Sequence, residues 1–239
     1  MKDLKYLFAY TVPISVYISF MSTGIWTYST VFYVFILLPI LDFLLGESKE
    51  NFSKEDASHQ NKKWIFDIML YFNIPIIFGL LYIVFSSFQS NDYNVFETVG
   101  LAFSTGLLLS INGINVAHEL GHRKPYYERF LSKLLYMPCL YMHFYIEHNF
   151  GHHLHVATPE DGATAKYNQS VYSFWFTSVT KQYFDAWKNQ KILLKTKNSS
   201  FISIKNDMIW YHLIQPLYLF VIYYLFSFEV MIFALAVGI

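Results

Sequence analysis

The sequence of 239 residues has little charge, little glycine and almost no cysteine. Only 14% of its residues are charged, whereas a soluble globular domain has about 25%, so an ordinary soluble domain is excluded. Ten glycines are too few for a collagen-like or linker-rich chain. The single cysteine, Cys139, excludes an internal disulfide and a multi-thiolate metal site, and we expect it to be a small buried side chain. Seventeen basic and seventeen acidic residues cancel, so no overall field attracts nucleic acid.

Apolar residues are abundant, because hydrophobic residues make up 54% of the chain and aromatic residues 21%. A helix needs about 20 mostly apolar residues to cross the hydrocarbon core of a bilayer. The sequence therefore predicts an all-α integral membrane protein with a single membrane domain over residues 1–239. We expect a six-helix bundle with spans over residues 6–24, 27–45, 64–86, 96–117 and 208–226, and a sixth span, 228–239, that is cut short.

Basic residues predict the orientation of these spans. Two precede the first span, eleven lie in the region 118–207, and four lie between the second and third spans: Lys49, Lys54, Lys62 and Lys63. Because cytoplasmic loops carry the excess of Lys and Arg, we expect the N-terminus and a histidine-rich cap over 118–207 to be cytoplasmic. Within the cap, residues 171–194 are expected to form a helix that lies in the membrane interface or packs on the protein itself.

Seven of the nine histidines lie between positions 118 and 155, in two clusters. HELGHR covers 118–123 and EHNFGHH covers 147–153. Residues four apart share one face of a helix, so His118 can bind one ion together with His122, and His148 can do so together with His152. His153 is turned by about 100° from its neighbour and can face a second ion. Imidazole suits Fe, Zn, Cu or Ni, so the residue type does not select the metal.

Other polar residues near the clusters have weaker signals. Glu119, Glu147 and His143 are candidates to orient the ligands through hydrogen bonds. No separate catalytic side chain is predicted, since the metal centre itself would be the reactive group.

Two alternatives use the same residues differently. HELGH also matches H-E-x-x-H, in which two histidines bind zinc and the glutamate is the general base of a membrane protease. One zinc ion needs about three protein ligands, however, and five closely spaced imidazoles exceed that need. A non-enzymatic metal transporter would carry ionisable residues at mid-membrane depth, and the expected spans are nearly free of them.

The two clusters, with the segment HVATPEDGATAK at 155–166, resemble the membrane-bound non-haem di-iron alkane 1-monooxygenases, relatives of the fatty acid desaturases and hydroxylases. The resemblance implies two iron ions, with ligand roles for His118, His122, His148, His152 and His153. It also implies O₂-dependent terminal hydroxylation of n-alkanes in a bacterial inner membrane. Electrons would come from rubredoxin, reduced by an NAD(P)H-dependent rubredoxin reductase. A xylene-type hydroxylase and a fatty acyl desaturase or hydroxylase are the close alternatives.

One departure from the family pattern concerns a third histidine group. The family has an N-Y-x-E-H-Y-G type segment and an H-x2-H-H type segment after the last span, and neither occurs in these 239 residues. Five ligands do not satisfy two irons that the family surrounds with about nine. The expectation is therefore an N-terminal fragment that does not form a working di-iron site by itself.

Overall fold

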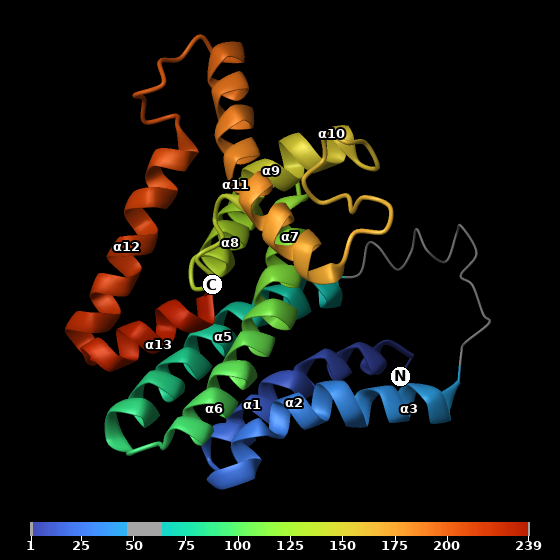
Figure 1. Cartoon of the computed structure of the whole chain (residues 1–239), viewed down its shortest axis with the longest axis vertical. Helices are drawn as coiled ribbons and strands as arrows, with labels where there is room; N and C mark the ends of the chain where they lie inside the picture. The colour runs from blue at the N-terminus through green and yellow to red at the C-terminus, as the bar shows by residue number, and fades with distance from the viewer. Residues whose placement is uncertain (1, 47–63, 239) are drawn as a thin grey trace. The chain divides into compact units, whose positions relative to one another are not determined.

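The computed structural model describes residues 2–46 and 64–238, in which all regular secondary structure is helical (Figure 1). The lysines at 49, 54, 62 and 63, on which part of the orientation depends, lie outside the described residues. The chain divides into two compact units, Met1–Val116 with Ile222–Ile239, and Ala117–Val221. We call these unit 1 and unit 2.

Unit 1 consists of apolar helices from both ends of the chain. In chain order they are η1 (Lys2–Tyr10), α1 (Thr11–Phe20), η2 (Gly24–Tyr28), α2 (Ser29–Phe32), η3 (Tyr33–Leu37), α3 (Leu38–Leu45), α5 (Trp64–Ser90), α6 (Val95–Leu108), η4 (Leu109–Ile114) and α13 (Phe228–Gly238). Helix α6 begins with a reciprocal capping box, in which the Asn94 side chain accepts from the backbone N–H of Glu97 while Glu97 accepts from that of Asn94. The second carboxylate oxygen of Glu97 accepts from the Gly24 N–H at 2.7 Å, which fixes the start of η2 against α6.

Hydroxyl groups and a close backbone approach join the helices of unit 1. Ser104 donates to the Thr27 carbonyl at 2.9 Å, and its hydroxyl oxygen lies 3.2 Å from that of Ser19. A Cβ atom at Gly100 would lie 2.5 Å from both the Thr27 hydroxyl and the Tyr28 ring, so only glycine fits there. Small and hydroxylated residues at helix contacts are typical of helices packed within a bilayer.

Four helices are long and apolar enough to cross a membrane: Gly24–Leu45, Trp64–Ser90, Val95–Gly121 and Asp207–Leu225. They correspond to four of the expected spans, which confirms the prediction of an all-α protein with membrane-spanning helices. The segment 6–24 instead divides into the 3₁₀ helix η1 and the ten-residue α1, which carries Pro13 in its first turn. Helix α13 is apolar but has only 11 residues. The six-span count therefore stays a prediction.

Unit 2 contains all the clustered histidines. Its helices are the end of α7 (Asn115–Gly121), α8 (Tyr126–Tyr136), α9 (Phe144–Glu147), η5 (His148–His152), α10 (His153–His155), α11 (Val171–Thr196) and most of α12 (Asp207–Leu225). Tyr141 donates to Gln182 at 2.9 Å, which holds the turn before α9 on α11. Cys139 is 4% exposed, as expected, and burial raises the pKa of its thiol to about 12.

Candidate metal centre

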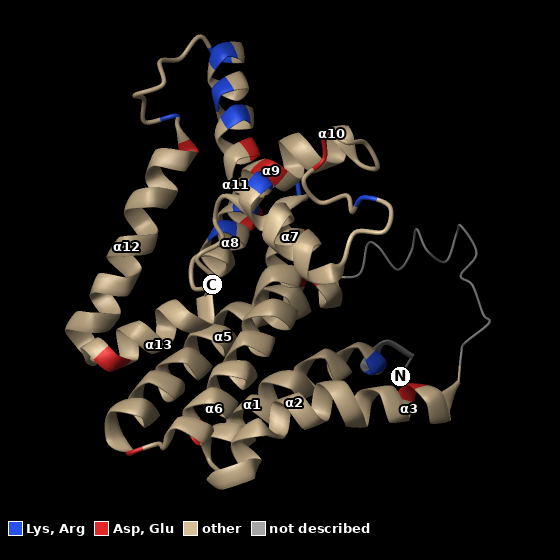
Figure 2. Ribbon diagram, in the orientation of Figure 1, with Lys and Arg blue, Asp and Glu red and all other residues tan. Residues whose placement is uncertain are grey.

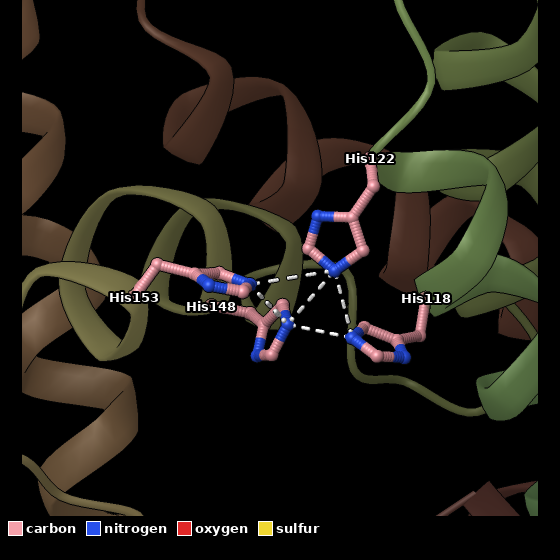
Figure 3. A group of neighbouring side chains, drawn as sticks. All are labelled: His118, His122, His148 and His153. Carbon is pink, nitrogen blue, oxygen red and sulfur yellow. Dashed lines mark hydrogen bonds between the residues drawn. The ribbon is translucent and has the colours of Figure 1, made fainter. Parts of the chain in front are cut away.

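Two helical segments of unit 2 bring four of the five predicted ligands together (Figure 3). His118 lies on α7 and His122 directly follows that helix, while His148 begins η5 and His153 begins α10. One ring nitrogen from each of the four lies within 4.8 Å of the others. The spacing of four residues between the first pair thus produces the shared face that the sequence predicts.

The Nε2 atoms of the cluster lie close together: the two distances of His153 are those expected between ligands of one metal ion, whereas the two of His118 are shorter. His118 Nε2 lies 2.7 Å from His148 Nε2 and 2.8 Å from His122 Nε2. His153 Nε2 lies 3.0 Å from His148 Nε2 and 3.4 Å from His122 Nε2. Ligand nitrogens about 2.1 Å from one metal ion are separated by roughly 3.0 to 3.4 Å, for 90° and tetrahedral angles respectively. Because a neutral imidazole has only one N–H, four Nε2 atoms facing one point cannot all pair with each other, and a cation there would satisfy them.

Burial and repulsion from neighbouring histidines favour the neutral form of His148 and of His153, and the neutral form is the one that binds metal. Burial and the neighbouring histidines lower the pKa of His148 to about 3. Burial, His122 and His152 also lower the pKa of His153. The donor set therefore fits an imidazole-binding transition metal such as iron.

His152 is placed differently from the other four. Residues 148–152 form one turn of π-helix, in which the backbone N–H of His153 donates to the carbonyl of His148. This wider turn brings residues five apart onto one face, so His153 rather than His152 joins His148 at hydrogen-bond distance. The ring of His152 instead stacks beside that of His148, with centroids 5.2 Å apart.

Asp161 holds the ring of His152 and was not predicted from the sequence. His152 Nδ1 lies 3.0 Å from both carboxylate oxygens of Asp161. The carboxylate also accepts from Thr164 and, at 2.9 Å, from the N–H of Ala163. Burial alone would raise the pKa of Asp161, but these hydrogen bonds outweigh it and lower the pKa, so the group is an anion at neutral pH. A carboxylate on Nδ1 leaves Nε2 of the same ring available as a metal ligand.

The three residues expected to orient the ligands have other surroundings. Among residues 2–46 and 64–238, none of the three hydrogen-bonds to a clustered histidine. Glu119 forms an ion pair with Arg123 at 3.0 Å. Glu147 is 1% exposed, and burial followed by repulsion from Asp161 raises its pKa to about 7. His143 is 8% exposed and packs between two tyrosine rings, and its Nε2 has no hydrogen-bond partner in the part of the chain that the structure describes.

A family model described as fatty acid desaturase matches residues 95–239, which is more than half of the chain and includes every clustered histidine. The chain belongs to the fatty acid desaturase family. This desaturase-family chain is 30% identical over 210 residues to alkane 1-monooxygenase 2 of Alcanivorax borkumensis, covering 87% of the chain and 55% of the relative. It is 31% identical over 190 residues to alkane 1-monooxygenase of Pseudomonas putida, covering 79% and 45%.

A third relative is named for a different substrate. The hydroxylase component of xylene/toluene monooxygenase from Pseudomonas putida is 26% identical over 220 residues, covering 88% of the chain and 56% of the relative. The desaturase-family chain spans about half the length of the curated relatives it matches.

Proposed function

We propose that the chain provides histidine ligands of a non-haem di-iron centre in a membrane alkane 1-monooxygenase. The convergence of four Nε2 atoms in a chain similar to proteins of that name carries the proposal. When iron is bound, the chemistry it supplies is O₂ activation, with the balance RH + O₂ + 2e⁻ + 2H⁺ → ROH + H₂O. The likeness to the named relatives supports n-alkane and O₂ as substrates.

The five histidines divide into two roles in this proposal. His118, His122, His148 and His153 hold one ion, and His152, oriented by its carboxylate partner, faces the second. The lowered pKa values of His148 and His153 favour the neutral rings that bind metal. Five histidines do not complete two iron sites, so we propose that the 239 residues alone bind metal without hydroxylating alkanes.

Membrane-spanning helices would hold the other substrate. An n-alkane has no polar group, so its binding free energy comes from burial, about 0.8 kcal/mol for each CH₂. The distribution of Lys and Arg supports a six-span bundle whose N-terminus and histidine-rich cap face the cytoplasm of a bacterial inner membrane. A cap in the cytoplasm would be accessible to rubredoxin, the electron donor we propose together with its reductase.

The test uses a chimera in which this chain replaces the matching half of the Pseudomonas putida alkane 1-monooxygenase. We expect iron in the purified chimera and conversion of octane to 1-octanol, both lost in His148→Ala. A metal-free chimera that still hydroxylates octane would refute the proposal. The isolated chain, assayed in parallel, should bind iron and yield no octanol.

Xylene-type hydroxylation is the second candidate, because the xylene/toluene monooxygenase component matches 88% of the chain. Assays of the chimera with octane, xylene and an acyl substrate separate it from alkane hydroxylation and from acyl desaturation. A zinc protease has less support, because four histidines converge and Glu119 forms an ion pair with Arg123.

A further inference from the structure

Unit 2 contains a cavity of about 400 Å³ that none of the four clustered histidines lines. Its walls come from α8, from the region of α9 and η5, from the end of α11 and from the start of α12. Four basic side chains line it, against one acidic side chain, Asp207; the basic ones are Arg129, Lys133, Lys197 and Lys205. Figure 2 shows how Lys and Arg gather on α11, whereas α12 carries none. A volume of this size suits a small charged ligand or the head group of a lipid.

Most of the positive charge in this cavity is uncompensated. Lys133 pairs with Asp207 at 2.9 Å and also lies 4.8 Å from the centre of the Tyr145 ring. The side chains of Arg129 and Lys205 form no ion pair with any described residue, and the same holds for Lys197. These three cationic side chains line the same cavity, so they favour an anion that can accept several hydrogen bonds at once. A phosphate group is such an anion.

A buried amide adds a second requirement. Gln190 is 3% exposed and lines the cavity. Its amide nitrogen donates to the Lys205 carbonyl at 3.3 Å, but its Oε1 atom is buried without a partner among the described residues. A buried acceptor without a donor costs about 1–3 kcal/mol, so a ligand that brings a hydroxyl would remove a penalty as well as add a contact.

The cavity also lies beside a membrane-spanning helix. Asp207 is the first residue of α12, one of the four helices able to cross a bilayer, and the ends of such helices lie at the depth of lipid head groups. Tyr126 and Phe130, which also line the cavity, are 79% and 57% exposed, and exposed aromatic rings are typical of the membrane interface. Basic pockets at this depth bind anionic lipid head groups.

We propose that this cavity binds the phosphodiester of an anionic phospholipid whose head group carries a hydroxyl, as in phosphatidylglycerol. Arg129, Lys197 and Lys205 contact the phosphate, and Gln190 accepts from the head-group hydroxyl. The proposal does not depend on the metal centre, because the site shares no clustered histidine with it.

Native mass spectrometry of the full chain in neutral detergent tests the proposal with three lipids of identical acyl chains. We expect phosphatidylglycerol to bind at least tenfold more tightly than phosphatidylcholine, and more tightly than phosphatidylmethanol, which has the same charge but no hydroxyl. At about 1 kcal/mol for each basic residue, the Arg129→Gln/Lys205→Gln variant should bind phosphatidylglycerol roughly 30-fold more weakly. The control Lys191→Gln/Lys195→Gln removes two charges from α11 outside the cavity and should change the affinity less than threefold.

The hydroxyl is tested separately with Gln190→Leu, which should abolish the preference for phosphatidylglycerol over phosphatidylmethanol. Thermal unfolding verifies that each variant is folded. If Gln190→Leu does not fold, the Arg129→Gln/Lys205→Gln variant still tests whether the cavity binds the anionic lipid. Equal binding of phosphatidylglycerol and phosphatidylcholine, or equal loss in the pocket and control variants, would overturn the proposal. So would displacement of the lipid by an equal concentration of inorganic phosphate, which would indicate a site for free phosphate.

Discussion

Replacing Asp161 by Asn tests whether His152 is a metal ligand. Asp161 accepts from His152, Thr164 and the N–H of Ala163, and it is ionised at neutral pH because hydrogen bonds lower its pKa. Asn keeps the shape but has one acceptor oxygen and no charge, so it cannot receive all three donors. A hydrogen bond to a charged group contributes about 1 kcal/mol more than a neutral one. The bond that matters for the metal is the one from His152, and losing a hydrogen bond to a charged group costs about 2 kcal/mol.

This loss should appear as weaker binding of the ion that His152 faces. Two kcal/mol corresponds to roughly 30-fold in affinity, within the 10- to 100-fold range found when the partner of a metal-bound histidine is removed. Titration of the purified chimera with Co²⁺, followed by its visible absorption, reports the two ions separately. We expect the tighter ion, held by the four clustered histidines, to keep its affinity within about threefold, because none of them contacts Asp161.

Asp185→Asn is the matched control. Asp185 is 15% exposed and bonds to Lys181 and Lys188, each at 2.9 Å, but it bonds to none of the histidines that the structure describes. It should leave both metal affinities unchanged. A folded Asp161→Asn variant that binds both ions as tightly as the unmodified protein would refute the role of His152.

Three further changes have expected outcomes. His148→Ala removes one of four ligands and should weaken binding of the tighter ion more than 100-fold, because four ligands together bind zinc with about 10–16 kcal/mol. The control is His155→Ala, which changes an exposed histidine outside the cluster and should leave the affinity unchanged. Burial and then His212 lower the pKa of His143 to about 4, so the native state binds fewer protons than the unfolded state between pH 4 and 6.5. Stability should therefore fall on acidification through that range, by up to about 3 kcal/mol. His143→Phe should flatten the dependence of Tm on pH, and an unchanged slope would contradict this assignment. Gly100→Ala would clash with the tyrosine ring beside it and should cost about 1–3 kcal/mol in thermal unfolding, whereas Gly106→Ala on the same helix has open space and should not destabilise.

Local helical geometry explains what the sequence could predict. The length of an apolar run sets a membrane span, so the helices beginning at Trp64 and Asp207 were predicted closely. The region near the N-terminus was less predictable, because hydropathy does not report whether a turn is α or 3₁₀. His118 and His122 lie side by side, as their spacing predicts, because one helical turn at the end of α7 connects them and their distance depends on local geometry alone.

The partner of His152 depends on tertiary structure, and only a faint signal of it is present in the sequence. Asp161 is nine residues further along, in a segment without regular helix that includes Ala157 in the left-handed region at φ 64°. No periodicity predicts where such a segment places one carboxylate. Asp161 lies within the stretch 155–166 that resembles the alkane 1-monooxygenases, and an acidic residue close after a histidine cluster is the feature that could have indicated it.

The π-turn at 148–152 explains why two adjacent histidines can serve two ions. In an α-helix, His148 and His152 would share a face, and His153 would project about 100° from His152 and about 140° from His148. The wider turn assigns His153 to the face of His148 and directs Nδ1 of His152 to Asp161. The two adjacent rings therefore have separate contacts: His153 contacts the histidine cluster, and His152 contacts the Asp161 carboxylate. The extra backbone residue in that turn, more than the histidine spacing itself, separates the two proposed ligand positions.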